Sequence, residues 1–271
     1  MDFWREVLRV IDWRMETPQP YGWFHLMSFA LSILAAVALC VLYRKGKLRN
    51  IRLVVLVTAI TVTVLEVYKQ INFSFSYENG IEFDYSWWSI PWQFCSMPMY
   101  VGLVAGLTKG RVHRSCCAFL ATYAMFAGAC VMFYPTTVFV ETIGINIQTM
   151  VCHGSMLTIG VLLMYTEYVK LEHRTILRAM PVFAVGVGIA MIINELAYVT
   201  GLLETDTINA FYISPYCEPH LPVYSLVQPL VPFPVGVALY IGGFTLASYL
   251  ILLVCMGIKQ LAQKKMTKMA V

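Results

Sequence analysis

The sequence predicts an all-α fold, a bundle of seven transmembrane helices preceded by an N-terminal amphipathic helix. The first observation is the composition, since 59% of the residues are hydrophobic and 13% are charged, a balance outside that of soluble domains. The second is that long apolar stretches recur along the chain, and the third is that Lys and Arg gather in alternate gaps between them. These observations predict a multi-pass membrane protein.

Seven stretches have the length that a transmembrane helix needs, because a hydrocarbon core of about 30 Å takes about 20 apolar residues in helical form. They lie at residues 22–43, 53–72, 89–108, 115–134, 144–165, 176–202 and 231–257. No internal repeat or soluble insert interrupts them. The chain is therefore expected to consist of an interfacial helix at 1–20, a membrane domain at 21–258 and a basic cytoplasmic tail at 259–271.

The basic residues predict the orientation. Of the 19 Lys and Arg, fifteen lie in the gaps after the first, third and fifth stretches, at the start of the sixth stretch (Arg178) or near the C-terminus. Basic loops are retained in the cytoplasm, so the N-terminus is expected outside and the C-terminus inside the cell membrane. Since these residues are spread over short loops that face anionic headgroups, no nucleic-acid partner is expected.

Residues 1–20 predict a helix that lies in the membrane interface. Apolar residues follow one another there at helical spacing until two prolines end the pattern: Trp4, Val7, Leu8, Ile11 and Trp13, then Pro18 and Pro20. Such a helix lies with its apolar face in the headgroup region. The segment lacks the apolar core and cleavage pattern of a signal peptide, so we expect it in the mature chain.

Four polar residues interrupt four different stretches at a similar depth. Counted from the outer boundary at 1.5 Å per residue, Glu66 and Cys95 lie about 9 Å inside, and His153 and Asn194 about 12 to 14 Å inside. A charged side chain that faces lipid there costs about 2.5–3.5 kcal/mol or more. The pattern predicts a polar cavity in the outer half, although Glu66 is also spaced to pair with Lys69, one turn outward.

Helical spacing extends two of these positions into stripes. Asn146 and Thr149 precede His153 on one face, and Tyr198 lies one turn from Asn194. The stripes are consistent with a cavity lining. They are equally consistent with hydrogen bonds that only tie neighbouring helices together.

Cys95 differs from the other cysteines in its surroundings. It follows Pro91, Trp92 and Gln93 at the outer start of the third stretch, where unpaired backbone N–H groups and the helix dipole favour a thiolate. His153 at a similar depth permits a Cys–His pair. The alternative interpretation is a small buried hydrophobe and a hydrogen-bonded core histidine.

No metal site and no cofactor are predicted. Cys and His do not occur at the short spacings of zinc ligands, and His113 and His173, which lie in the basic loops, are expected to be solvated. A retinal pigment has the same predicted topology but needs a lysine in its last span, and residues 231–257 contain none.

Short motifs along the membrane domain resemble the YwaF family of integral membrane proteins. The matching positions are Val64-Leu65-Glu66, Pro91-Trp92-Gln93-Phe94-Cys95-Ser96, Cys152-His153-Gly154, Ile193-Asn194, Asn209-Ala210-Phe211-Tyr212 and Val231-Pro232-Phe233-Pro234. The family includes eukaryotic transmembrane protein 164, a membrane acyltransferase that remodels phospholipids. The chain departs from many bacterial relatives at Gln93, where they have a histidine.

The resemblance implies an acyltransferase, or a lipid hydrolase, whose partners are membrane phospholipids. Cys95 matches the family's nucleophile, which carries the acyl group as a thioester, and His153 matches its general base. The remaining site residues are expected to bind or orient the substrate: Glu66, Gln93, Thr149, Asn194, Tyr198 and Asn209.

Two other functions stay open at this stage. In a transporter or binding protein, Glu66, His153 and Asn194 would line a path for a small molecule or a proton, and Cys95 would tolerate replacement. A non-enzymatic scaffold would tolerate replacement at every polar position. The sequence predicts no particular oligomeric state.

Overall fold

The computed structural model describes residues 2–78, 80–136, 138–203, 208–218, 221 and 223–269. Within these residues, six helices are long and apolar enough to cross a membrane. They are α2 (Trp23–Arg44), α3 (Ile51–Asn72), the continuous run Gly110–Phe133, α7 (Ile143–Tyr165), α8 (Arg174–Val199) and α10 (Phe233–Met269). The predicted all-α membrane fold is confirmed.

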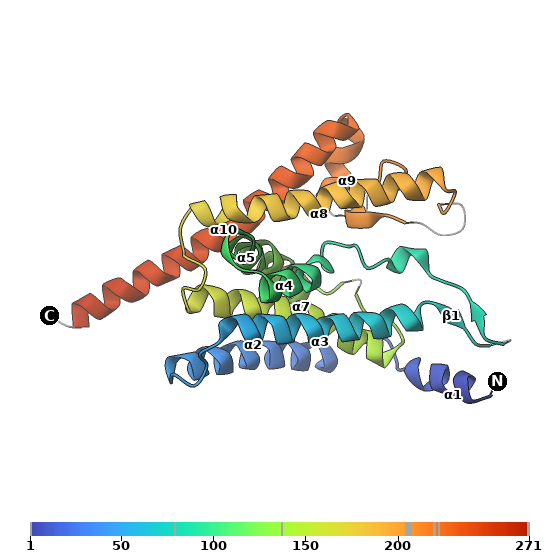
Figure 1. Ribbon diagram of the computed structural model, residues 1–271, viewed down its shortest axis with the longest axis horizontal. Helices are drawn as coiled ribbons and strands as arrows, with labels where there is room; N and C mark the ends of the chain where they lie inside the picture. The colour runs from blue at the N-terminus through green and yellow to red at the C-terminus, as the bar shows by residue number, and fades with distance from the viewer. Residues whose placement is uncertain are drawn as a thin grey trace.

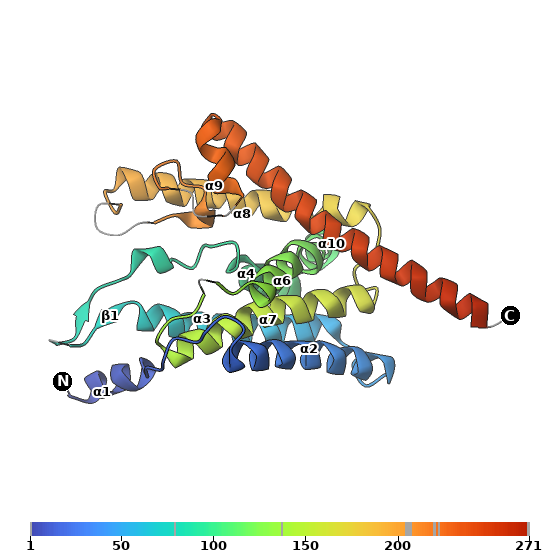
Figure 2. The same cartoon turned by 180° about the vertical axis from the view of Figure 1, so that it is seen from behind.

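The helices pack around a buried centre (Figures 1 and 2). On one side α7 contacts α2, α3 and α6 (Met125–Phe133), and on the other α8 contacts α5 (Gly110–Phe119). A fully buried π-helical turn, η2 (Leu120–Ala124), joins α5 to α6 and contacts both α7 and α10. The run α5–η2–α6 therefore lies between the two sides.

The shorter elements complete the chain. They are α1 (Asp2–Ile11), the antiparallel pair β1 (Phe75–Ser76) and β2 (Glu82–Phe83), η1 (Trp87–Ser89), α4 (Met97–Leu107), η3 (Ala210–Tyr212), α9 (Tyr224–Val227) and η4 (Gln228–Leu230). Most of them lie at the end of the bundle that carries α1, which we call the loop end (Figure 1).

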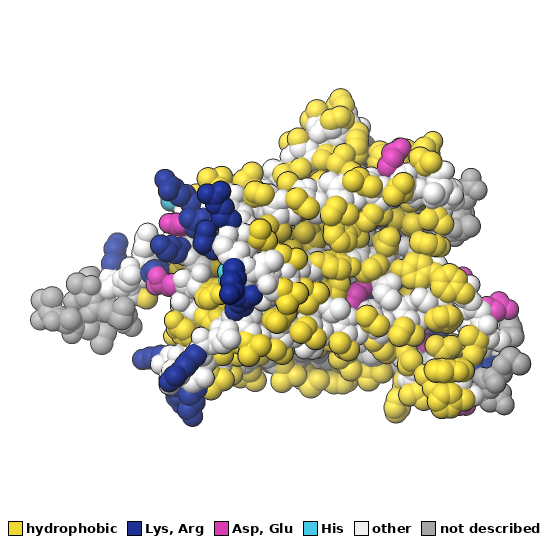
Figure 3. All heavy atoms as spheres, viewed as in Figure 1, with side chains coloured by type: hydrophobic (Ala, Val, Ile, Leu, Met, Phe, Trp, Pro, Cys, Tyr) yellow, Lys and Arg dark blue, Asp and Glu magenta, His cyan; other side chains and the backbone are white. Residues whose placement is uncertain are grey.

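Lys and Arg side chains gather at the opposite end, which we call the basic end. Figure 3 shows them there over the turns that follow α2, α4 and α7, while hydrophobic side chains cover the middle of the molecule. The two termini lie at opposite ends of the molecule (Figure 1). The predicted clustering of basic residues is thus a feature of the fold.

The third predicted stretch differs from the other six. Residues 89–108 form a helix only over α4, whose 11 residues span about 16 Å, roughly half of the hydrocarbon core. The chain nevertheless travels from the end of α3 at the loop end to the start of α5 at the basic end. Residues 90–96 and α4 together make this passage, so seven full-length helices are not observed in the described residues.

The segment that follows α1 fastens it to the loop end. The Tyr68 hydroxyl donates to Ile11 O at 2.6 Å, and the Asp12 carboxylate accepts from the hydroxyls of Thr142 and Tyr77, each at 2.7 Å. The helix predicted within residues 1–20 is therefore present, and hydrogen bonds from three different parts of the chain hold its C-terminal side.

Candidate functional site

Residues 90–96 lead into α4 without regular secondary structure. Pro91 has no backbone N–H to continue a helix, and Pro98 lies in the first turn of α4, where proline is tolerated. The Tyr100 hydroxyl donates to Pro91 O at 2.9 Å. In a membrane, irregular backbone is tolerated only where protein encloses it or where it lines a cavity. Cys95 lies near the end of such a segment.

A second irregular segment, residues 208–214, lies between α8 and α9. Phe211 and Tyr212 both adopt positive φ, at 58° and 56°, a conformation that costs about 1–3 kcal/mol per non-glycine residue and is concentrated at functional sites. The Asn194 side chain holds the segment through two hydrogen bonds to Ala210, donating to its O at 3.1 Å and accepting from its N at 2.7 Å.

Gln93 joins the two irregular segments. Its Nε2 donates to Asn209 O at 2.9 Å, and its Oε1 accepts from Phe211 N at 2.9 Å. The amide therefore satisfies two backbone groups that lie more than a hundred positions away in the sequence. Three residues predicted for the site, Gln93, Asn194 and Asn209, thus meet at the segment 208–214.

Glu66 forms a charged cluster on α3. Its carboxylate accepts from Lys69 Nζ and Gln70 Nε2, each at 2.8 Å, and from Gln148 Nε2 of α7 at 3.0 Å. The Tyr85 hydroxyl in turn donates to Gln70 Oε1 at 2.6 Å. The ion pair expected between Glu66 and Lys69 is confirmed, and three donors surround the buried carboxylate.

Cys95 and His153 lie in neighbouring segments but share no hydrogen bond in the described structure. The Cys152 thiol, one residue before His153, donates to Cys95 O at 3.6 Å. His153 Nδ1 donates to Thr149 O at 2.8 Å, which leaves Nε2 as the basic nitrogen, and the described residues offer Nε2 no partner. Lys69 interacts electrostatically with both the Cys95 thiol and the His153 ring.

Comparison with known proteins assigns the chain to a family. The model of the TMEM164 family matches residues 20–258, which is most of the chain. The protein belongs to the TMEM164 family. This confirms the relationship expected from the motifs, and the match covers both irregular segments and the Glu66 cluster. No curated protein and no solved structure matches the chain.

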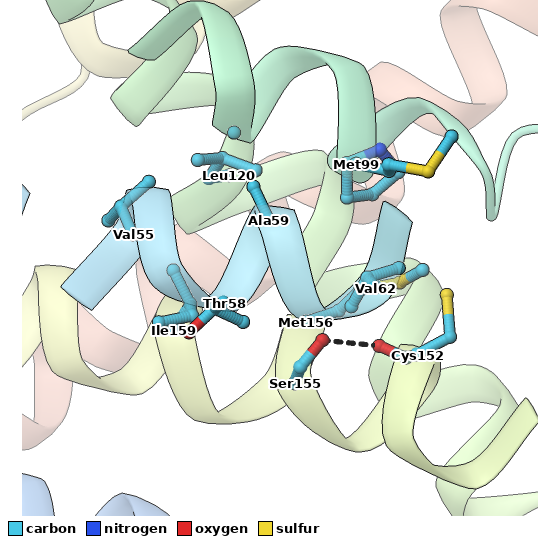
Figure 4. A pocket seen from close by; sticks show the side chains of 12 residues that line it. Val55, Thr58, Ala59, Val62, Met99, Leu120, Cys152, Ser155, Met156 and Ile159 are labelled. Carbon is cyan, nitrogen blue, oxygen red and sulfur yellow. Dashed lines mark hydrogen bonds between the residues drawn. The ribbon is translucent and has the colours of Figure 1, made fainter. Parts of the chain in front are cut away.

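In this TMEM164-family protein an apolar groove lies between α3, α4 and α7 and ends close to the Cys95 segment. Its enclosed volume is about 30 Å³, and the empty space along it is about 340 Å³ when the part open to solvent is included. Figure 4 shows Cys152 projecting from α7 at one end of it, where the Ser155 hydroxyl donates to Cys152 O at 2.8 Å. Its lining is mostly hydrophobic and includes Val55, Ala59, Val62, Met99, Met156 and Ile159.

Two predicted site residues lie in different surroundings. Tyr198 is 54% exposed and stacks on Tyr216 with ring centroids 3.8 Å apart, so the structure does not bring it to Asn194. Thr149 contacts His153 through its backbone oxygen, while its hydroxyl donates to Gln148 Oε1 at 3.4 Å. Asn146, from the same stripe, caps the preceding loop through Val140.

Gln148 was not predicted as a site residue, because it lies outside the helical stripe of Asn146, Thr149 and His153. The spacing of Glu66 and Gln148 in different helices offers no signal that they meet. In the described part of the chain, no group of three or more His, Cys, Asp or Glu side chains is close enough to hold a metal ion. The reactive groups of the site are the thiol of Cys95, the imidazole of His153 and the ion pair of Glu66 and Lys69.

Proposed function

We propose that this TMEM164-family protein is a membrane acyltransferase that acts on phospholipids through a Cys95 thioester. The observation that carries the proposal is the position of Cys95, which lies half-buried in an irregular segment that packs against α7, with His153 one residue from that contact. The groove beside Cys152 has an apolar lining, which matches a hydrocarbon chain once the groove widens around it, and the family resemblance points to the same chemistry.

The reaction divides into two acyl transfers. His153 Nε2 takes the Cys95 proton, and Sγ attacks the carbonyl carbon of a lipid ester. The bond from that carbon to the glycerol oxygen breaks, the leaving alkoxide takes the proton from His153, and the acyl group stays on sulfur. An acceptor hydroxyl then loses its proton to His153 and attacks the thioester, so the C–S bond breaks and the thiol is restored.

The contacts of His153 and Glu66 support their assigned roles. The bond from His153 Nδ1 to Thr149 O fixes the tautomer in which Nε2 is basic, so Thr149 is an orienting residue through its carbonyl. Glu66 holds Lys69 in place at 2.8 Å, and Lys69 in turn provides positive potential beside the thiol. Catalytic contacts that are open in the free protein commonly close when substrate binds.

The same proposal includes the orientation. With the basic end in the cytoplasm, the site lies in the outer half of the cell membrane, near the depth of lipid ester groups. Phe3, Trp4 and Trp13 are highly exposed along the N-terminal segment, as expected for a helix in the headgroup region.

The test is the intact mass of the purified protein after incubation with mixed phospholipids. We expect an acyl adduct on the wild-type protein that hydroxylamine removes. The adduct is absent from Cys95→Ala and retained in Cys130→Ala, a matched variant of an exposed cysteine in α6. If the wild-type protein stays unmodified and Cys95→Ala has no effect beyond that, the acyl transfer is refuted. A transport path lined by Glu66, His153 and Asn194 would then be favoured.

A further inference from the structure

Three buried hydrogen-bond donors beside the proposed site lack partners in the described structure. They are Asn209 Nδ2, Tyr240 Oη and Tyr224 Oη, and their residues are only 6%, 3% and 8% exposed. Buried polar groups in proteins are nearly always hydrogen-bonded, and each exception calls for an explanation. In a membrane interior no bulk water is at hand to pair with such groups.

Asn209 is held so that its amide N–H₂ group stays free. Its Oδ1 accepts from Ser214 N at 3.0 Å, and its backbone O accepts from Gln93 Nε2 at 2.9 Å. Both contacts fix the residue and use only its oxygens. Because Gln93 is two residues from Cys95, the unpaired N–H₂ group lies beside the segment that carries the thiol.

Tyr240 approaches the same segment from α10. Its ring packs against Phe244 with centroids 4.5 Å apart, and Phe244 packs against Phe94 at 4.8 Å. Phe94 directly precedes Cys95, and the Tyr240 hydroxyl and the Cys95 thiol interact electrostatically. The ring of Tyr224 lies 5.3 Å from that of Tyr240, so its hydroxyl belongs to the same group.

These groups are neutral and donate hydrogen bonds, in contrast to the charged cluster of Glu66 and Lys69. Neutral donors fixed in a dry site are what stabilises a carbonyl oxygen as it gains negative charge. They keep their protons while the oxygen of the tetrahedral intermediate is charged, and the charge leaves that oxygen when the C–O bond breaks.

We propose that Tyr240 Oη and Asn209 Nδ2 bind the carbonyl oxygen of the acyl ester and form the oxyanion hole of the site. The inference rests on the proposed acyl transfer for its catalytic meaning. The binding of an ester carbonyl by these two donors is a separate property, which needs no turnover.

The first measurement separates binding from turnover. Phosphatidylcholine labelled with ¹³C at its ester carbonyls is bound to Cys95→Ala, and the carbonyl stretch is recorded by isotope-edited infrared spectroscopy. We expect a band at lower frequency than that of the lipid in vesicles, and its loss in Cys95→Ala/Tyr240→Phe. If Cys95→Ala shows no such band, the carbonyl site is refuted, whatever the outcome of the adduct experiment.

The second measurement is the rate of adduct formation in the wild-type background. Tyr240→Phe removes only an unpaired hydroxyl, so we expect a rate about 10²-fold lower with no loss of thermal stability. Tyr123→Phe is the matched control, because the Tyr123 hydroxyl is already bonded to Thr245 Oγ1 at 2.7 Å, and its rate should be unchanged. An equal rate in Tyr240→Phe and wild type would overturn the assignment of Tyr240. A shifted carbonyl band without any wild-type adduct would instead refute the acyl transfer and leave the binding site intact.

Discussion

Two regions of the described structure hold a cysteine and a histidine, namely Cys117 with His113 at the basic end and Cys95 with His153 in the proposed site, and they differ in how completely their polar atoms are bonded. At the basic end, His113 Nδ1 donates to Ala105 O at 2.7 Å, while Nε2 accepts from the Tyr168 hydroxyl at 2.9 Å and contacts Cys117 Sγ at 3.6 Å. The prediction that His113 is solvated is therefore wrong, since both of its ring nitrogens have protein partners.

The pair in the other half of the bundle has the opposite character. His153 has one bonded nitrogen, and within the described residues it makes no hydrogen bond to Cys95. Asn209 Nδ2 and Tyr240 Oη, which lack partners in the described residues, belong to segments that contact Gln93 and Phe94 beside Cys95. A saturated pair such as Cys117 and His113 stabilises the fold, whereas unmet hydrogen-bonding capacity in an enclosed site is available to a substrate.

The largest effect should come from replacing the two histidines in matched variants. His153→Asn keeps a donor for Thr149 O but has no basic nitrogen, so we expect the rate of Cys95 acylation to fall about 10²–10⁴-fold. His113→Asn should acylate at the wild-type rate and lose about 1 kcal/mol of stability, because Tyr168 loses its acceptor. Adduct kinetics and thermal unfolding in detergent measure the two effects. If His153→Asn and His113→Asn lost the same rate of acylation, the lower rate would reflect impaired folding and not a role of His153 as base.

The second comparison concerns the ion pairs of the two halves. Glu66→Gln leaves the Lys69 ammonium, only 17% exposed, without its anion, and the expected cost is about 3 kcal/mol of unfolding free energy. Glu167→Gln breaks the exposed pair with Lys259 and should cost about 0–1 kcal/mol.

The control for this comparison is Glu66→Gln/Lys69→Met, which removes both charges and should recover part of the lost stability. Denaturant titration in detergent measures all three variants. Equally small losses for Glu66→Gln and Glu167→Gln would show that water reaches the Glu66 cluster, and the enclosed site would then be open to solvent.

Composition predicted the long helices well because lipid contact leaves a simple signal in the sequence. The stretches 53–72 and 144–165 agree with α3 and α7 to within two residues at each end, since apolar runs of this length have one stable form in a membrane. The stretch 89–108 is also long and apolar, but its helix is restricted to α4, after Pro91 and with Pro98 in the first turn. Counting apolar residues does not register backbone geometry.

The site divides in the same way. Glu66 and Asn194 could be singled out because a polar residue in an apolar helix has few explanations, whereas Gln93, which lies in an irregular segment, was expected only from the family motif. Tyr240 could not, because a tyrosine among aromatic residues resembles ordinary core packing, and only the folded chain shows that its hydroxyl lacks a partner. Gln148 depends on a contact between two helices that no local pattern encodes.

The smallest expected effect concerns Asp12, which attaches the N-terminal segment. It tests whether this attachment, like the contact of His113 with Cys117, serves only to stabilise the fold. Burial raises the pKa of Asp12, but the hydrogen bonds from Thr142 and Tyr77 and the nearby Arg14 guanidinium outweigh it, so the pKa lies below its ordinary value. A lowered pKa means that ionised Asp12 stabilises the attachment above about pH 3.8 and that this contribution is lost as the pH falls through the lowered pKa.

We therefore expect no change in the attachment of α1 between pH 8 and pH 5, and its release at lower pH. Hydrogen exchange of residues 2–15 measures the release, and Asp12→Asn should show part of it already at pH 7. Because α1 lies outside the region shared with the family, residues 20–258, Asp12→Asn should acylate Cys95 at the wild-type rate. A slower rate in Asp12→Asn would show that the attachment of α1 affects the site. It would contradict the distinction between groups that have all their hydrogen bonds and stabilise the fold, and groups with unpaired donors that bind substrate.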